Sequence, residues 1–218
     1  MRSQAGNFGS VVAVVLAFAL GEERAEANLY GFYNITGNSA TNAASGEAQL
    51  FVEVTDSGAG KVLFTFTNTG PSAASITDVY FDDAGGKLMT LTSISNSFGV
   101  DFEVGASPPN LPGANMVGPS FHADFDADSD PPTAPNGVNP GESLGISFDF
   151  NNGITFDDVI YNLGQASLRV GIHVQAFGDG GSESFINRMN PVPVPSAFLL
   201  GAFGLGLVGW MRRRSSAG

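Results

Sequence analysis

The sequence contains no cysteine, and its central part has very few basic residues. Without cysteine the chain forms neither disulfides nor thiolate metal sites, so its stability has to come from a packed core. Between residues 28 and 190, four basic residues stand against 18 acidic ones, a formal charge of −14. Such a surface repels phosphate backbones, so nucleic-acid binding is disfavoured, whereas divalent cations are attracted. These 163 residues are enough to bury one core, so we expect a single domain.

The N-terminal end differs from this acidic centre. Arg2 precedes an apolar run, VVAVVLAFAL at 11–20, that is too short to span a bilayer comfortably. Ala25 and Ala27 flank Glu26 in the small-x-small pattern of a signal-peptidase site. Residues 1–27 therefore predict a secretory signal peptide, an apolar helix that is removed after Ala27.

The central region has mostly the period-two hydrophobicity of β-strands. In AQLFVEVTD and KVLFTFTN alternate residues are apolar, and the Gly-containing link at 56–60 joins the two as a hairpin. SITDVYF, KLMTLTSI, GVDFEV, ESLGISFDF and SLRVGIHVQAF are rich in β-branched and aromatic residues. Many short strands separated by Gly/Pro turns predict an all-β domain. We expect a single β-sandwich, jelly-roll or immunoglobulin-like, with a closed barrel as the alternative.

One segment, GITFDDVIYNLG, has helical spacing instead. Thr155 and Asp158 match a capping box, and Gly164 stands where a helix stop belongs. The pattern predicts one short helix over Phe156–Leu163, and the acidic residues at its start are interpreted as caps.

One motif match and one histidine are the catalytic candidates of the sequence. Residues 141–145 match G-x-S-x-G, but a proline-containing turn precedes the serine and a strand pattern follows it, the reverse of a nucleophile elbow. His173 alternates with inward-facing residues, so we expect it on a solvated outer surface beside Arg169 and Gln175. No serine or cysteine pairs with it by sequence, and no enzyme activity is expected.

An acidic stretch is the main candidate for a metal site. Asp124, Asp126, Asp128 and Asp130 alternate, and carboxylates are the hard oxygen ligands that Ca²⁺ prefers. An EF-hand is excluded, because Ser129 occupies the position that needs glycine. In a strand all four carboxylates would share one face and repel one another unless a cation is present. Calcium binding and a hydrated acidic loop are the two alternatives.

The C-terminal region, 191–218, combines three elements of a sorting signal. Pro193, Val194 and Pro195 form a spacer, about 15 apolar residues follow at Ala197–Met211, and three arginines end the run: Arg212, Arg213 and Arg214. The arginines mark the cytoplasmic side by the positive-inside rule. The arrangement resembles a PEP-CTERM sorting signal, with Pro-Val-Pro in place of the usual Pro-Glu-Pro.

The central region also resembles an ectodomain of PEP-CTERM proteins, through GEAQLFVEV, VLFTFTNTGP, SITDVYFDD, DSDPPTAPNGVNPGE and GIHVQAFGDGGSESF. The resemblance implies export in a Gram-negative bacterium, transient anchoring in the inner membrane through the tail, and processing by an exosortase-type enzyme. It also implies a location at the cell surface or in the exopolysaccharide matrix, without an assigned activity.

Three functions are therefore considered for the ectodomain, residues 28–190. The preferred one is a non-enzymatic surface or matrix protein. The second is a calcium-dependent carbohydrate-binding module, for which Tyr30, Phe32 and Tyr33 are stacking candidates unless they fill the core. The third is a polysaccharide hydrolase, which needs two carboxyl groups about 5–10 Å apart. No cofactor other than calcium is expected.

Overall fold

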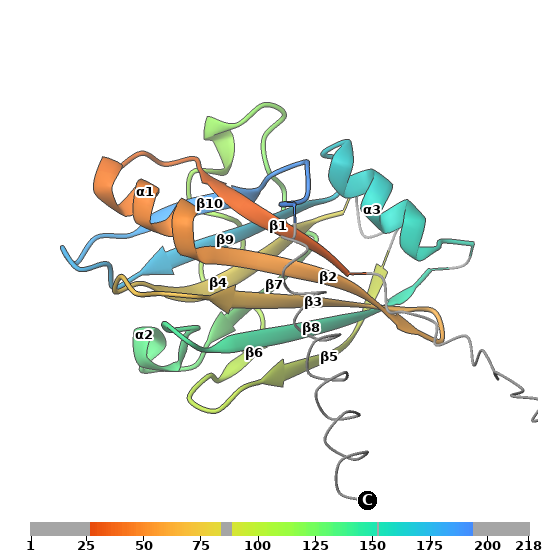
Figure 1. Ribbon diagram of the computed structural model, residues 1–218, viewed down its shortest axis with the longest axis horizontal. Helices are drawn as coiled ribbons and strands as arrows, with labels where there is room; N and C mark the ends of the chain where they lie inside the picture. Colours follow the sequence, from red (N-terminus) through yellow and green to blue (C-terminus); the bar gives the residue numbers. More distant parts are fainter. Residues whose placement is uncertain (1–26, 84–88, 152, 194–218) are drawn as a thin grey trace, which may run out of the picture.

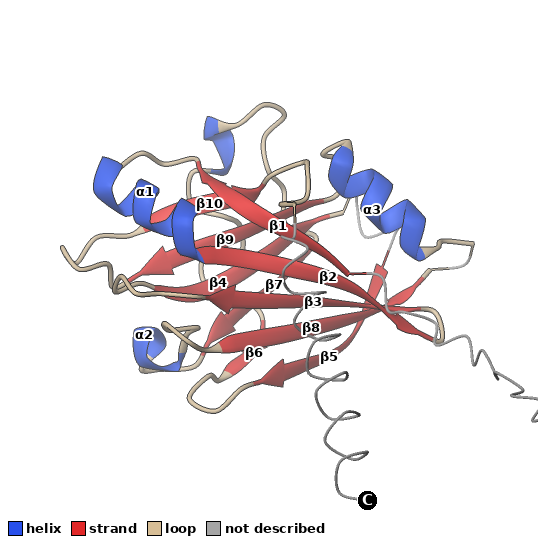
Figure 2. Ribbon diagram, in the orientation of Figure 1, coloured by secondary structure: helices blue, strands red, loops and turns tan. Residues whose placement is uncertain are grey.

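The computed structural model describes residues 27–83, 89–151 and 153–193, which form an all-β fold with a few short helices (Figures 1 and 2). Ala27 and Pro193 are the first and last of these residues. Ala25, Val194, Pro195 and the arginines at 212–214 lie outside the described residues. Within the described ranges, no helix is both long and apolar enough to cross a membrane.

Within the described residues, ten antiparallel strands make one nearly closed sheet in the order β5-β8-β3-β2-β1-β10-β9-β4-β7-β6. The strands are β1 Ala27–Asn34, β2 Leu50–Gly58, β3 Lys61–Asn68, β4 Ser75–Asp82, β5 Met89–Asn96, β6 Phe102–Val104, β7 Phe125–Ser129, β8 Ser143–Phe150, β9 Arg169–Gln175 and β10 Glu183–Asn187. All the segments predicted as strands from hydrophobic alternation contain one. The sheet also includes β1, β7 and β10, which were not among the segments predicted as strands.

Strand β1 joins the two halves of the sheet, because its two ends have different neighbours. Ala27–Gly31 pairs with β2, while Phe32–Asn34 pairs with β10. The β2-β3-β8-β5 half thus continues from one end of β1, and the β10-β9-β4-β7-β6 half from the other (Figure 1). At the seam between the edge strands, the side chain of Asn96 accepts a hydrogen bond from the Phe102 N–H and donates one to the Phe102 carbonyl.

The two halves enclose one apolar core that is rich in phenylalanine. Rings from β3 and β8 contact rings from β4 and β7 at centroid distances of 4.9–6.2 Å, mostly edge to face. Phe81 is central, since its ring touches Phe64, Phe66, Phe125 and Phe148. The predicted inward faces of β2 and β3 are confirmed, because Leu50, Val52, Val54, Val62, Phe64 and Phe66 are fully buried.

The predicted short helix is confirmed as α3, Phe156–Gly164. Its capping box is present: Thr155 Oγ1 accepts a hydrogen bond from the Asp158 N–H, and the Asp158 carboxylate accepts one from the Thr155 N–H. Gly164 is still helical and Gln165 is the C-cap, so the glycine is not the stop that its position suggested.

The expectation of a single helix is wrong, because α1 (Ala40–Gln49), α2 (Thr133–Asn136) and the 3₁₀ turn η1 (Ala114–Met116) also form. The sequence of α1, ATNAASGEAQ, has no apolar stripe, and its buried residues are Asn42, Gly46 and Gln49. Gly46 lets the helix approach the sheet closely, since a Cβ there would lie 2.3 Å from the ring of Phe185.

A second, smaller apolar cluster lies on the outer face of the β10-β9-β4 half. Residues 105–124 cross this face, and Leu111 and Phe121 pack against Tyr80 and Ile186. Gly171 on β9 leaves room for them, because a Cβ there would lie 2.8 Å from Leu111 Cδ2 and 3.1 Å from Phe121 Cζ. This half of the sheet is therefore covered on both faces.

Candidate ligand-binding site

Buried charge is concentrated in the doubly covered half of the sheet. Among the described residues the buried charged side chains are Asp78, Asp83, Arg169 and Glu183. They belong to β4, β9 and β10 or directly follow β4. Since a buried charge is costly unless it is paired, each of these groups must have partners that fix its surroundings.

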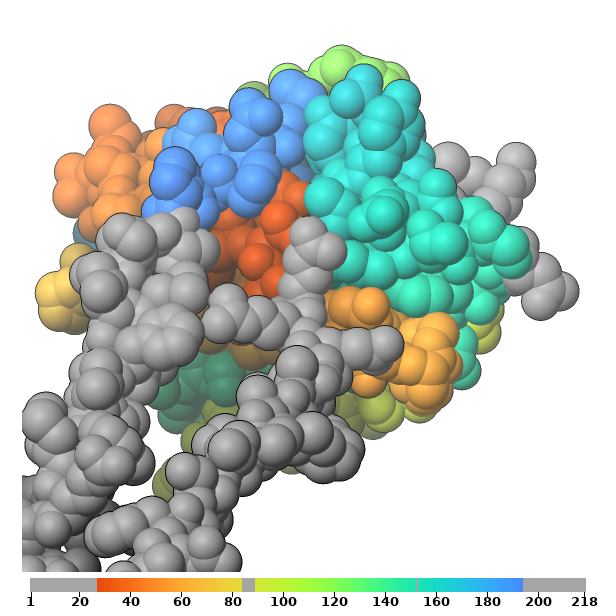
Figure 3. All heavy atoms as spheres, turned by 45° about the vertical axis from the view of Figure 1, so that its right-hand side comes forward, coloured from red at the N-terminus to blue at the C-terminus, as the bar shows by residue number. Residues whose placement is uncertain are grey.

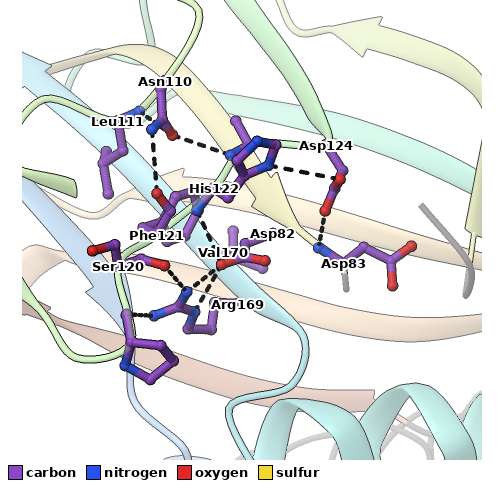
Figure 4. Close-up of polar contacts among 12 residues, drawn as sticks. Asp82, Asp83, Asn110, Leu111, Ser120, Phe121, His122, Asp124, Arg169 and Val170 are labelled. Atoms are coloured by element: carbon purple, nitrogen blue, oxygen red, sulfur yellow. Dashed lines mark hydrogen bonds and ion pairs between the residues drawn. The ribbon is translucent and has the colours of Figure 1, made fainter. Parts of the chain in front are cut away.

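Arg169 is the centre of the first of these networks (Figure 4). Its Nε and Nη2 atoms donate to Asp82 Oδ2, directly opposite on β4. Nη1 donates to the Pro119 carbonyl at 2.7 Å and Nη2 to the Ser120 carbonyl at 2.8 Å, while the Phe121 ring lies 5.2 Å from Cζ. The expectation of a solvated surface around Arg169 is wrong, because residues 105–124 cover it and leave it 8% exposed.

The same covering segment is held by short polar contacts (Figure 4). Asp82 also accepts a hydrogen bond from the His122 N–H. Asn110 bonds the backbone on either side of His122, and Asp124 Oδ2 accepts from the Asp83 N–H. The His122 side chain itself is 82% exposed, with Nδ1 3.8 Å from Asp124 Oδ1. The position of His122 is therefore fixed by hydrogen bonds of the backbone and not by its side chain.

A pocket of about 410 Å³ lies between the β1-β10 pair and the C-terminal end of α3. This volume is in the range of about 300–1,000 Å³ that small-molecule sites occupy. Figure 3 shows the surroundings: the end of the described chain, in blue, lies beside α3, in cyan. The apolar residues of the lining are Leu163, Ala166, Ile186 and Met189, and the polar or aromatic ones are Tyr33, Arg169, Asn187, Arg188 and Asn190.

The polar side chains of this pocket differ in how many hydrogen bonds they make to other parts of the protein. Asn187 is buried, accepts from the Val170 N–H at 2.7 Å, and donates to the Arg188 carbonyl at 3.1 Å. Arg188 is half exposed, and its Nη2 donates to Glu47 Oε2 of α1 at 2.8 Å. Two of the four basic residues between 28 and 190 thus line one pocket.

The four aspartates of the acidic stretch lie along β7 and at its two ends. Asp126 and Asp128 are on the strand, opposite Tyr80 and Asp78 of β4, so this part is not a loop. Within the ranges the structure describes, no group of three or more His, Asp or Glu side chains is close enough to hold a metal ion. The calcium site stays a prediction.

Negative charge is nevertheless crowded around Asp128. Burial raises the pKa of its carboxyl above the usual range, and the neighbouring charges of Asp78, Glu103 and Asp130 raise it further. A backbone hydrogen bond from Ser107 acts in the opposite direction but does not reverse the shift. The crowding follows from the sheet register, because Asp78 and Glu103 both stand opposite Asp128.

His173 is not the solvated residue that alternation predicted. Its side chain is 14% exposed, and Nδ1 lies 3.1 Å from Asp78 Oδ2. Ser184 of β10 stands opposite on the other side, so three strands bring together a serine, a histidine and an aspartate. The Ser184 hydroxyl, however, is buried without a hydrogen-bond partner among the described residues. The residue types of a catalytic triad are present, but the serine–histidine hydrogen bond is not.

Sequence reasoning missed Glu183, a 1% exposed residue. Its carboxylate accepts hydrogen bonds from the side chains of Asn34 and Thr36 and from the N–H groups of Asn38 and Ser39. Burial alone would raise its pKa, but these hydrogen bonds outweigh burial and lower it. Glu183 thus fixes the connection between β1 and α1. The sequence gives no signal for this, since the partners are about 150 positions away.

The remaining candidates from the sequence lie in three different places: the core, the pocket and the start of β8. Tyr30 and Phe32 are buried in the core, whereas Tyr33 is half-buried and lines the pocket. Ser143 is the first residue of β8, which confirms that the G-x-S-x-G match is not a nucleophile elbow.

No protein-family model matches this chain, and no significant match is found among curated proteins or solved structures. The site is therefore interpreted from its own residues.

Proposed function

We propose that the protein is an exported, non-enzymatic binding protein of the cell surface or extracellular matrix, delivered by the signal peptide and the C-terminal tail. The main supporting observation is the position of the two ends of the domain. The Val192 N–H donates to the Leu29 carbonyl at 2.6 Å, and the Arg188 N–H donates to the Gly31 carbonyl at 2.8 Å. The residues that adjoin the two sorting segments therefore lie side by side along β1. A domain built this way attaches at one point and leaves its other faces free.

The rest of the domain is consistent with a ligand-presenting role. We interpret the sheet as a sandwich of two halves hinged at β1, because the inner faces pack on each other through the phenylalanine cluster. The pocket lies at the border of this core: Leu163 and Ile186 of its lining belong to the apolar clusters, whereas Arg188, Met189 and Asn190 are exposed and can vary without disturbing the packing. The negative surface keeps such a protein soluble.

Truncation of residues 191–218 tests the delivery by the tail. In the native host we expect the truncated protein to fold as before, from circular dichroism and melting temperature, but to disappear from surface labelling. A variant in which Arg212, Arg213 and Arg214 are replaced by Gln should behave in the same way. N-terminal sequencing of the exported protein should begin at Asn28. Unchanged surface labelling of the truncated protein, or Met1 on the exported chain, would contradict the proposal.

A calcium-dependent carbohydrate-binding module is the second candidate, and the charge crowding around Asp128 supports it. A bound cation would relieve that repulsion, and binding at 100 times the dissociation constant would stabilise the fold by about 2.7 kcal/mol. We expect a melting temperature several degrees higher in CaCl₂ than in MgCl₂ or NaCl of equal ionic strength. The double variant Asp126→Asn, Asp128→Asn should remove this difference. Equal shifts in the three salts would exclude the calcium site.

A further inference from the structure

We propose that the pocket beside β1 and β10 binds a carboxylate-bearing sugar ring, such as a uronate unit of an acidic polysaccharide. The inference rests on the proposed function, since it assigns a ligand class to the exported binding protein. Three properties of the pocket support it: its charge, its aromatic and apolar wall, and an ion pair that a ligand can replace.

The pocket brings two arginines together in a strongly acidic domain, and each of them is paired with one carboxylate. Residues 28–190 carry a formal charge of −14, yet two of their four basic residues meet here. Arg169 is largely occupied, because Asp82 and two backbone carbonyls take four of its donor contacts. Arg188 keeps most of its guanidinium available, since its side chain donates to Glu47 alone among the described residues. A single carboxylate suits a guanidinium with only one protein partner, because its planar fork can bind a carboxylate through two parallel hydrogen bonds.

The same pocket also has an apolar surface. Tyr33 is half-buried there, and Leu163, Ala166, Ile186 and Met189 complete the apolar part of the wall. A ligand that fits must therefore have an apolar face for the ring and polar groups at its edge. A sugar ring has both, with C–H bonds on its faces and hydroxyls around it. The volume of about 410 Å³ gives room for roughly one or two such rings.

The Arg188–Glu47 pair gives the site a built-in competitor. The two side chains are 49% and 35% exposed, so their ion pair is a weak one that a ligand can displace. The other carboxylate oxygen of Glu47 accepts a hydrogen bond from the Asn34 N–H, which holds Glu47 in place when Arg188 leaves it. The carboxylate of the sugar takes the position of Glu47 Oε2 on the guanidinium.

This exchange predicts opposite effects for two variants that break the same ion pair. Arg188→Gln removes the group that binds the ligand, so affinity for glucuronate should fall roughly 10- to 100-fold. Glu47→Gln removes the competitor and keeps an oxygen for the Asn34 N–H, so affinity should rise about two- to fivefold. A purely structural role of the ion pair would move both variants in the same direction.

The experiment measures binding of glucuronate, glucose and acetate to the purified full chain by calorimetry. We expect glucuronate to bind more tightly than both, because glucose lacks the charge and acetate lacks the ring. Tyr33→Leu should weaken glucuronate binding several-fold, by more than the small loss of packing against the Ile186 cluster would explain. Equal binding of glucose and glucuronate, equal binding of acetate and glucuronate, or no binding would overturn the inference. Each result is independent of the surface-labelling test, so failure of the ligand and failure of delivery remain distinguishable.

Discussion

The two halves of the sheet have the same strand geometry but differ in how many of their faces are buried. In β3 and β8, buried residues alternate with partly exposed ones, as expected for a sheet with one face on the core. In β4 every residue except Asp82 is buried, and β10 is buried throughout, because residues 105–124 and the flanking connections cover the outer face. The comparison teaches where binding groups arise in this fold. The buried charges of the described residues all lie in the doubly covered half or directly after β4, and the pocket opens at the border of this half.

The strongest test of this comparison uses one ion pair from each half. Arg169→Met breaks the buried pair with Asp82 and leaves an uncompensated carboxylate, so we expect a loss of about 3–5 kcal/mol in the free energy of unfolding. Lys61→Met breaks the exposed pair with Asp149 in the other half, and its effect on urea unfolding should be close to the measurement error. Similar losses in the two variants would show that the outer cover of β9 does not exclude water.

Glu183 gives the next largest effect and a pH dependence. Glu183→Gln keeps the shape but replaces charge-assisted hydrogen bonds, so we expect a loss of about 1.5–3 kcal/mol at pH 7. The pKa of Glu183 is lower in the folded than in the unfolded state, so its contribution is present above the unfolded pKa and is lost as the pH falls through the folded pKa. Wild-type stability should decline below about pH 5, and part of this decline should vanish in the variant. Parallel pH profiles would rule out this role.

Substituting one glycine in each half of the sheet tests whether residues 105–124 pack directly on its outer face. Gly171→Ala places a methyl group 2.8 Å from Leu111 and 3.1 Å from Phe121, so the covering segment has to shift, at a cost of about 1–3 kcal/mol. Gly145→Ala on β8 meets Leu63 at 3.3 Å and Ser95 at 3.5 Å on an open face, where the neighbours can adjust. Chemical denaturation should therefore separate the two variants. If Gly171→Ala unfolds like wild type, residues 105–124 are not packed on β9.

The same difference explains how much of the molecule could be predicted. Alternation of apolar and polar residues identifies β2 and β3 and their inward faces, because one face of each strand is in the core and the other is in contact with water. It fails for Arg169 and His173, because a polar residue on an outer face looks the same in sequence whether solvent or another segment covers it. Helix α3 is predictable from the sequence, because its capping box and its helical spacing are local features. The pocket could not be found, because Tyr33 and Arg188 meet only through the pairing of β1 with β10.

The smallest effect is expected at Ser184, and it tests whether the buried hydroxyl opposite His173 is without a hydrogen-bond partner. Ser184 and Ser75 are both completely buried in the doubly covered half. The Ser75 hydroxyl donates to the Ala134 carbonyl at 2.8 Å, whereas the Ser184 hydroxyl has no partner among the described residues. Ser75→Ala should therefore cost about 1 kcal/mol, while Ser184→Ala should be neutral or stabilising by up to about 1 kcal/mol, because it removes an unsatisfied polar group. Thermal unfolding of the two variants gives the comparison. A loss at Ser184 as large as that at Ser75 would mean that its hydroxyl is hydrogen-bonded in solution, and His173, which stands opposite it on β9, is the first partner to test.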